Sequence, residues 1–162
     1  MQKIKNCLWF NTEAEEAANF YISIFKNSKI TRVLLCNEAA AQASGQPKDS
    51  VWLVEFELDG QPFLALNGGP DFKFTPAISF IVDCHSQEEI DHYWDRLSAV
   101  PEAEACGWLC DKFGISWQIV PSEVVAMVSD PDPAKSQRAT LSLMEMKKLN
   151  IVELRRAYEQ EN

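Results

Sequence analysis

Glu55 is the side chain of this sequence best placed for acid–base chemistry. It alternates with the apolar residues Val54 and Phe56 in a strand-like segment, so it should point away from the face on which they pack. A carboxylate in a partly apolar surround has a raised pKa and can serve as a general base. A solvated strand carboxylate, matching Glu57, is the simpler alternative.

Three amide side chains are candidates for binding a small molecule. Gln118 follows Trp117 in a strand-like segment, and Gln118 lies on the free face of its sheet if the tryptophan packs beneath helices. Hydrogen bonds to neighbouring backbone would explain this amide equally well. Asn6 and Asn67 stand at predicted strand ends, although turn chemistry before Gly68-Gly69 explains Asn67 at least as well.

Phe72 and Phe74 are the aromatic candidates for ligand contact. They lie on a linker, residues 67–76, whose Gly and Pro residues separate two patterned regions of the chain. Closing over a bound ligand and filling a subunit interface would both use these two rings.

Metal ligands are scarce in this sequence. Transition metals need imidazole, carboxylate or thiolate groups. The two histidines, His85 and His92, fall in or beside a predicted helix rather than on a predicted strand. Cys106 and Cys110 lack a second pair, and in a strand they would lie about 13 Å apart, so we interpret them as core thiols. We expect no metal and no other cofactor.

The elements that carry these side chains occur twice along the chain. A strand, a helix and three strands are predicted at residues 4–10, 13–25, 29–36, 51–58 and 61–67, with Asp59-Gly60 as a hairpin turn. After a restart, the same order is predicted at residues 77–84, 86–98, near 104, near 108 and at 116–121. Residues 37–50 are predicted to form a polar, alanine-rich loop. This duplication predicts two similar modules.

Residues 123–162 are predicted to be helical. Pro133, after Asp130-Pro-Asp, is placed as the first residue of one helix, and Asn150 with Glu153 makes a capping-box-like start for the last one. We therefore predict a single domain over residues 1–162, with module one at 1–70, module two at 75–122 and C-terminal helices at 123–162.

The composition is that of one soluble globular domain. The 162 residues, 46% hydrophobic and 24% charged, can form a core without disulfides. A formal net charge of −9 disfavours nucleic acid as a partner. The first apolar run ends at Phe10 and is too short for a signal or a membrane span. Five cysteines without framework spacing favour the reducing cytoplasm.

Several motifs in order resemble one known family over nearly the whole chain. They are LWF at 8–10, AEEAANFY at 14–21, FELDG at 56–60, LNGG at 66–69, AISF at 77–80, CGWL at 106–109 and FGISWQIVP at 113–121. The sequence is similar to the PhnB-like proteins, or 3-demethylubiquinone-9 3-methyltransferase domain family. This family is a branch of the vicinal-oxygen-chelate superfamily of glyoxalases, bleomycin-resistance proteins and dioxygenases.

The resemblance implies an α+β fold of two βαβββ modules that form an incomplete barrel, with a ligand in the cup and a homodimer as the usual state. Metal-dependent members hold a divalent ion through His, Gln or Glu from the first and last strands of each module. The matching positions are Asn6 or Cys7, Ala65 or Leu64, Ala77, and Gln118. The sequence departs from the family pattern at each of them.

We therefore expect a metal-independent protein that binds a small organic ligand, or performs modest chemistry on it through Glu55 or a cysteine. The alternatives are a metal-dependent lyase, isomerase or dioxygenase, a methyltransferase as in the family name, and a drug-sequestering resistance protein. The missing ligands weigh against the metal enzymes. A methyltransferase would normally need a glycine-rich loop after a strand for adenosylmethionine, and the one glycine pair, Gly68-Gly69, lies in the linker.

Overall fold

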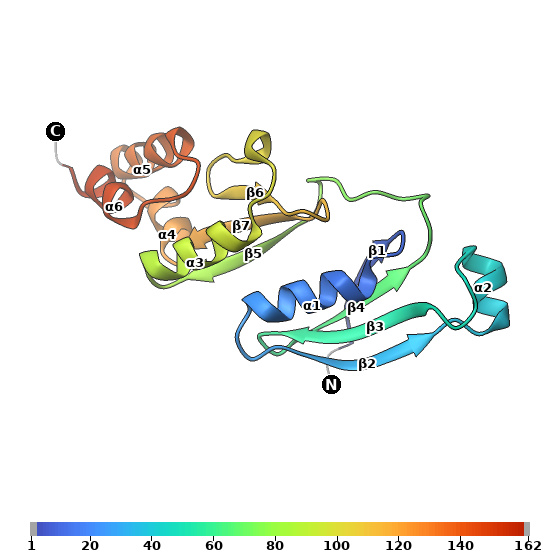
Figure 1. Cartoon of the computed structure of the whole chain (residues 1–162). Coiled ribbons are helices and arrows are strands. Elements are labelled where there is room, and N and C mark those ends of the chain that lie inside the picture. Colours follow the sequence, from blue (N-terminus) through green and yellow to red (C-terminus); the bar gives the residue numbers. More distant parts are fainter. Residues whose placement is uncertain (1–2, 161–162) are drawn as a thin grey trace. The chain divides into compact units, whose positions relative to one another are not determined.

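The structure, a computed structural model, describes residues 3–160 of the chain. The chain divides into two compact units, residues 1–74 and 75–162, whose helices and strands are labelled in Figure 1. Each unit contains one small β-sheet and a helix packed against it. Within the described residues, every helix is too short or too polar to cross a bilayer.

The first unit is a four-stranded mixed sheet with helix α1 on one face. Its elements are β1 (Asn6–Phe10), α1 (Ala14–Ile24), β2 (Lys29–Leu35), α2 (Glu38–Ser44), β3 (Val51–Leu58) and β4 (Gln61–Asn67). The strand order is β1-β4-β3-β2, in which β1 runs parallel to β4 and the other neighbours are antiparallel. The predicted turn joins β3 to β4, because Asp59 and Gly60 both adopt the positive φ, 45° and 76°, that a two-residue hairpin needs.

Helix α1 packs closely on the sheet because alanines line much of its inner face. Its buried residues repeat every three to four positions, as the sequence predicted: Ala14, Ala17, Ala18, Tyr21 and Ile24. They meet β3 on the side of Val54 and Phe56, which are 0% and 1% exposed. The alternation of the strand therefore sends Glu55 to the opposite face, as predicted.

Residues 37–50, predicted to be a loop, contain helix α2. The Asn37 side chain caps this helix by accepting a hydrogen bond from the Ala40 amide at 2.9 Å. Gly45 ends it in the left-handed conformation, with a φ of 71°. The loop prediction was wrong. Asn37 and Gly45 together mark the two ends of a short helix, and these caps decide the local structure despite the polar composition.

The second unit repeats the order of the first with one strand reduced. Its sheet region contains β5 (Ser79–Cys84), α3 (Gln87–Leu97), the 3-10 turn η1 (Pro101–Ala103), β6 (Trp108–Cys110) and β7 (Ser116–Pro121). The strand order is β5-β7-β6. The strand predicted near Glu104 is a single bridge between Ala105 and Trp108, because η1 takes up the residues directly before it.

A buried carboxylate fixes the hairpin between β6 and β7. Asp111 is 1% exposed, and its Oδ1 accepts hydrogen bonds from the amides of Phe113 and Ile115 at 2.8 and 3.0 Å. Its Oδ2 accepts a third bond from Trp117 Nε1 at 2.8 Å. Asp111 thus sets both the turn and the position of the tryptophan beneath α3.

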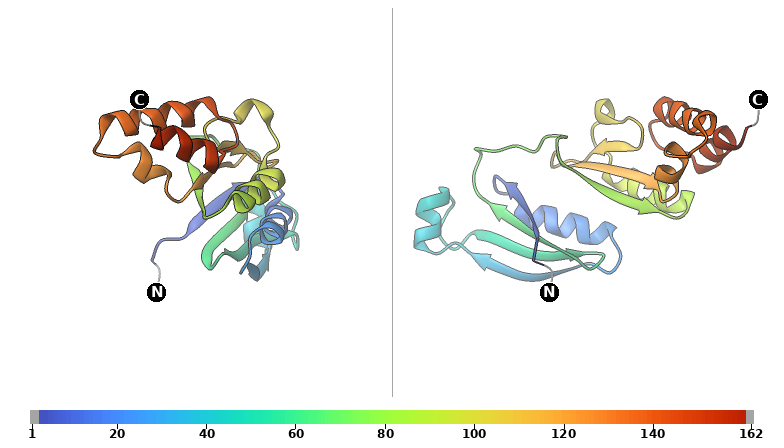
Figure 2. Two further views of the ribbon diagram at one scale, coloured as in Figure 1. Left: turned by 90° about the vertical axis from the view of Figure 1, so that its left-hand side faces the viewer. Right: turned by 180° about the vertical axis from the view of Figure 1, so that it is seen from behind.

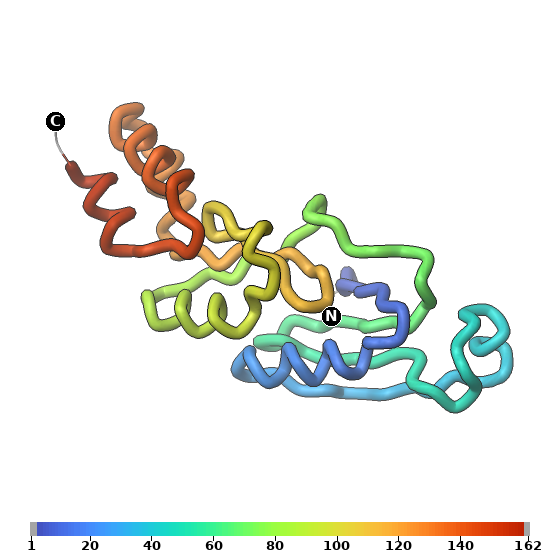
Figure 3. Tube along the Cα trace, turned by 45° about the horizontal axis from the view of Figure 1, so that its top comes forward, coloured from blue at the N-terminus to red at the C-terminus, as the bar shows by residue number. Residues whose placement is uncertain are grey.

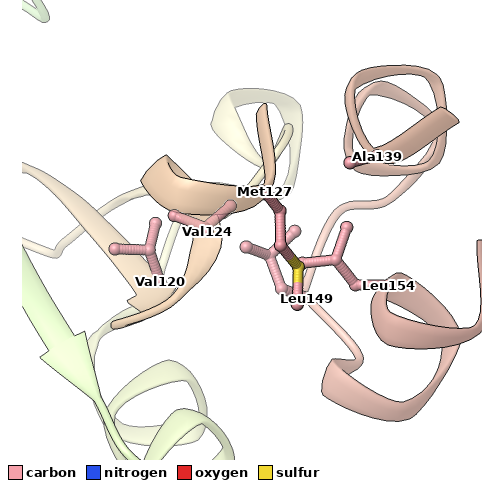
Figure 4. Packing of buried hydrophobic residues seen from close by; sticks show 6 residues of the cluster. All are labelled: Val120, Val124, Met127, Ala139, Leu149 and Leu154. Carbon is pink, nitrogen blue, oxygen red and sulfur yellow. The ribbon is translucent and has the colours of Figure 1, made fainter. Parts of the chain in front are cut away.

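Three helices complete the second unit: α4 (Val124–Val128), α5 (Pro133–Glu145) and α6 (Ile151–Glu159). Figure 2 shows them from two further sides, and Figure 3 shows α5 and α6 lying side by side. The predicted helix starts are confirmed, since Pro133 opens α5 and Asn150 Oδ1 accepts from the Glu153 amide at 3.0 Å. A shared core joins these helices to β7: Val120, Val124, Met127, Ala139, Leu149 and Leu154 (Figure 4).

The connection between α5 and α6 is bound by the tight turn before β6. The amide of Cys106 donates to the carbonyl of Met146 at 2.8 Å, and the amide of Gly107 donates to that of Lys147 at the same distance. A Cβ on Gly107 would lie 3.0 Å from Leu149 Cδ1. Gly107 therefore permits both the positive φ of 85° and the close approach of the connection.

Helix α3 binds the other side of the same connection. The Gln87 amide uses both ends, because Nε2 donates to the Leu149 carbonyl and Oε1 accepts from the first amide of α6, each at 3.0 Å. Lys148 Nζ lies 3.1 Å from carboxylate oxygens of Asp91 and Asp95. The C-terminal helices are therefore an integral part of the second unit.

Replacing Leu149 by Ala should lower the free energy of unfolding by about 2–5 kcal/mol, since the side chain is fully buried in the helical core. Leu141→Ala is the matched control: this leucine is 55% exposed on α5, and its loss should change the stability by less than about 0.5 kcal/mol. Urea unfolding followed by circular dichroism measures both. Equal effects of the two substitutions would contradict the packing described.

Candidate functional site

The face of the first sheet opposite α1, called the open face below, carries one row of paired side chains. Strand register places Cys7 beside Leu64, and Leu64 beside Glu55. Glu55 is in turn paired with Arg32 of β2. Directly paired residues point to the same side of a sheet, so these four side chains come together from four different strands.

A β-bulge at Thr31 brings Arg32 into this row. Ile30 pairs with Phe56 of β3. Arg32 already pairs with the next residue of the ladder, Glu55, so Thr31 is the extra residue of the bulge. In a regular strand Arg32 would share the α1 side with Ile30. The bulge instead directs the guanidinium to the open face.

Arg32 and Glu55 form a bidentate ion pair. Arg32 Nε donates to Glu55 Oε2 at 2.8 Å, and Nη2 donates to Oε1 at 2.9 Å. The hydrogen bonds and the charge of Arg32 hold the pKa of Glu55 below its usual value, against a weaker opposing effect of burial. The raised pKa expected from the sequence was wrong because the bulge supplies a cation. A carboxylate of lowered pKa is a weaker general base.

A groove of about 390 Å³ lies over this part of the open face. Its lining includes Lys5, Asn6, Cys7, Glu55, Phe63 and Leu64. The volume falls in the range of sites for small organic molecules. Four of these residues can form polar contacts, while Leu64 offers apolar surface. The Phe63 ring packs on Phe56 on the α1 side.

The structure also decides between the two strand registers that the sequence allowed. Cys7 and Leu64 share the open face, whereas Ala65 is fully buried on the α1 side. Asn6 is paired with Phe63 at the start of β1, and it still contributes to the groove. Cys7 is an exposed residue, but neighbouring atoms partly desolvate its thiol and raise the pKa, which lowers its reactivity as a nucleophile.

Asn67, another predicted ligand-binding residue, is built into the fold of the first unit. It is 4% exposed, and its Oδ1 accepts a hydrogen bond from the Ala14 amide at 2.8 Å, which caps α1. Its Nδ2 donates to the Val51 carbonyl at 2.9 Å. Both ends of the amide therefore tie β4 to its neighbours, and a role in ligand binding stays a prediction.

The linker residues pack against strand β1. Trp9 Nε1 donates to the Gly69 carbonyl at 2.9 Å, and a Cβ on Gly68 would lie 2.4 Å from the Trp9 ring. Phe72 meets Trp9 edge-on at 4.9 Å between centroids, while remaining 64% exposed. Phe74 meets Phe10 in the same manner at 5.3 Å. Contact of Phe72 and Phe74 with a ligand stays a prediction.

Gln118 lies in the second unit, on the sheet face opposite α3. Trp117 is 3% exposed on the α3 side, and Gln118 Nε2 donates to Ser79 Oγ at 2.9 Å. The register pairs Gln118 with Ile81, whereas Ala77 lies before β5 begins. Asn6 and Ala65 belong to the first unit, and Ala77 and Gln118 to the second. The expected clustering of these four residues stays a prediction.

The residues at the superfamily's ligand positions do not fit a divalent metal ion. The open face offers the Cys7 thiol beside an apolar Leu64, and the second unit offers Gln118, already bonded to Ser79. One neutral thiol and one amide leave the charge of an ion uncompensated. Within residues 3–160, no three His, Cys, Asp or Glu side chains gather as a metal site would require.

Nor do the glycines fit an adenosylmethionine site. Gly68 follows strand β4, but it packs on the Trp9 ring, and the next regular element is strand β5 rather than a helix. A glycine-rich nucleotide loop opens a helix whose N-terminus binds the ligand. Gly68 therefore serves the packing of Trp9.

Comparison with known proteins settles the family. The family model described as 3-demethylubiquinone-9 3-methyltransferase matches residues 2–120. The chain belongs to this family. A PhnB protein from Bacillus cereus is 35% identical to it, and the match covers 74% of this chain and 99% of that chain with a TM-score of 0.61. The family's printed name describes a methyltransferase, but no curated protein matches the chain.

Two further solved structures are similar. A protein from Staphylococcus aureus is 26% identical over 76% of this chain and 98% of its own, with a TM-score of 0.31. A protein from Pseudomonas aeruginosa is 19% identical over 74% of this chain and 96% of its own, with a TM-score of 0.54. The match to the Bacillus cereus protein shows the vicinal-oxygen-chelate fold of PhnB-like proteins, here without a closed barrel.

The C-terminal helices set this chain apart from the family match. The family model ends at residue 120, directly before the segment that forms α4, α5 and α6. The Bacillus cereus protein is matched over almost all of its length by only 74% of this chain. This family member therefore carries a helical extension that is fastened to its second module.

Sequence reasoning missed Arg32 and Asp111. Arg32 was hidden by a bulge, for which the sequence offers no clear signal. Asp111 stands three residues before Gly114, and its position at the start of a hairpin loop is typical of a side chain that accepts loop amides. That signal was available.

Replacing Asn67 by Ala should lower the free energy of unfolding by about 1–3 kcal/mol, because it leaves the first amide of α1 without its acceptor. Asn67→Asp keeps an acceptor for Ala14 but loses the donor to Val51, so it should have an intermediate effect. Chemical unfolding measures both. An unchanged stability in the Ala variant would contradict the structural role.

The Arg32–Glu55 pair should stabilise the protein at neutral pH and less in acid. The folded pKa of Glu55 is lowered, so its contribution is present above the usual value of 4.5 and is lost as the pH falls through the folded value. Glu55→Gln should therefore flatten the acid limb of the stability profile. In an Arg32→Gln background the same substitution should have little effect on the acid limb. Melting temperatures of the natural protein, the two single variants and the double variant between pH 3 and pH 7 test this prediction.

Proposed function

We propose that this protein binds a small organic molecule in the groove of the open face, without a metal ion. The observation that carries the proposal is the groove itself, which lies over Cys7, Leu64 and Glu55. In the metal-dependent superfamily members that this chain resembles, the metal ligands lie on the corresponding strands. Here the corresponding positions on the open face are Cys7 and Leu64, which suit contact with an organic molecule better than coordination of a metal ion.

Binding is better supported than catalysis by the groups in the groove. Arg32 lowers the pKa of Glu55, and partial desolvation raises the pKa of the Cys7 thiol. A carboxylate of low pKa is a weak base, and a neutral thiol is a weak nucleophile. Glu55 is therefore proposed as a polar contact for the ligand, with Asn6 beside it in the same groove.

The other functions considered have less support. A lyase, isomerase or dioxygenase would need the metal donors that the ligand positions lack. A methyltransferase would need an adenosylmethionine site, which Gly68 does not provide. Drug sequestration is a special case of the proposed binding, and ligand identity decides between the two.

A homodimer in the cytoplasm is the proposed working state. Each sheet leaves one face without a helix of its own unit. Exposed isoleucines lie at the edge strands: Ile4 shortly before β1, Ile78 directly before β5 and Ile81 within β5. A second copy would bury such surface. All five cysteines are free, which suits a reducing compartment.

A blocking substitution tests the proposed groove. Leu64→Arg should remove binding, because it places a long side chain on the groove floor. Leu66→Arg is the matched control, since Leu66 shares the strand and the open face but is not part of the groove lining. Thermal shift against a panel that includes adenosylmethionine, quinones and glycopeptides should show a stabilising compound for the natural protein and the control only.

Two results would contradict the proposed function. One is a panel, extended to a general metabolite library, in which no compound stabilises the natural protein. The other is near-stoichiometric zinc, nickel or manganese bound by dialysed protein that lacks a histidine tag.

The dimer is tested separately by light scattering. The expected mass is twice 18.4 kDa at tens of micromolar protein. Ile81→Asp should shift the mass toward the monomer, because it places a charge on the exposed face of β5. A monomeric mass for the natural protein would contradict the proposed state.

A further inference from the structure

We infer that the groove recognises a small organic carboxylate, whose oxygens bind the outer edge of the Arg32 guanidinium while its apolar body lies on Leu64 and Pro62. This inference rests on the proposed function and names the class of ligand.

Arg32 has a second binding edge. A guanidinium carries five N–H donors in a planar fork, and Glu55 takes only the edge formed by Nε and Nη2. The outer edge, formed by Nη1 and the second hydrogen of Nη2, makes no hydrogen bond with residues 3–160. Arg32 lies beside the groove, next to Glu55 of its lining, and its side chain is 61% exposed, so this edge is open to a ligand that extends from the groove.

The ion pair holds this edge in a fixed orientation. Glu55 is 29% exposed and sits on a central strand of the sheet, so it provides a firm anchor for the longer arginine side chain. The bulge at Thr31 sets Arg32 directly opposite that anchor. Orienting a donor before the ligand arrives lowers the entropy that binding costs.

The charges around the groove favour one negative group on the ligand. Lys5 lines the groove and lies near enough to Glu55 to help lower its pKa. Lys29 pairs with Glu57 one row away, with 3.6 Å between Nζ and Oε2. Because Lys29 and Glu57 neutralise each other, Lys5 and Arg32 face the one remaining carboxylate, Glu55, on a protein whose net charge is −9. The overall charge opposes polyanions, so a monoanion fits best.

The apolar part of the ligand has a surface beside these charges. Leu64 lies next to Glu55 in the row, and Pro62, which pairs with Glu57, continues the groove wall along β4 on the same face. An apolar ring or chain placed there would be removed from water, whereas a purely inorganic anion would gain nothing from it. An organic carboxylate uses both parts of the site.

The probe is 1-naphthoate, with the uncharged 1-naphthamide as its matched comparison. Binding is followed by NMR of the full chain, using the Nε–Hε resonance of Arg32, which is identified by its loss in Arg32→Gln. Naphthoate should shift this resonance and should bind at least about tenfold more tightly than naphthamide. Arg32→Gln should lower naphthoate affinity by a similar factor.

Two variants make the result specific. Lys29→Gln removes one positive charge from the same strand and the same face, and it should leave naphthoate affinity within about twofold. Arg32→Lys keeps the charge without the planar fork, and it should recover only part of the loss. Thermal melting confirms that each variant is folded.

Equal losses in Arg32→Gln and Lys29→Gln would overturn the inference, because general charge rather than the Arg32 edge would then attract the ligand. Equal binding of naphthamide and naphthoate, abolished by Leu64→Arg, would overturn it while leaving the proposed groove intact. Absence of binding for both probes would overturn it as well, and the library screen described above would then decide the proposed function on its own.

Discussion

Strand register is the constraint on which the candidate site depends. Side chains alternate between the two faces of a strand, so one extra residue moves every later side chain to the other face. The bulge at Thr31 makes this move once, and it turns Arg32 from the buried side to the open face. The ion pair with Glu55, the lowered pKa of that carboxylate and the exposed guanidinium edge all follow from this one displaced residue.

Most of the fold could be predicted because its signals are local. The hairpin at Asp59 and the starts of α5 and α6 each depend on residues within four positions of one another, and all were placed correctly. Helix α2 shows the limit of composition as a guide, since its caps at Asn37 and Gly45 were present in the sequence. The reduced strand near Ala105 depends on how η1 competes for the same residues, which periodicity does not reveal.

The candidate site could be predicted only in part, because its chemistry depends on contacts between distant residues. The face of Glu55 followed from alternation, but its pKa is set by Arg32, which is 23 residues away in the sequence. Asn67 was predicted to bind a ligand, with turn chemistry as the alternative. Its cap on Ala14 spans 53 residues and could not be seen from its neighbours. Local patterns thus predict where a side chain points, while tertiary contacts decide what it can do.

The hydrogen bonds that hold the α5–α6 connection have a consequence for the order in which the chain folds. The turn at Cys106 and Gly107, and the amide of Gln87, find their partners only in residues 146–151. Those partners leave the ribosome after the groups that they bind, since synthesis proceeds from the N-terminus. The first unit has every strand of its sheet by residue 67 and can fold during synthesis. The second unit must wait with unpaired amides until residues 146–151 have been synthesised, so a premature stop within α5 would leave the first unit intact and the second incomplete.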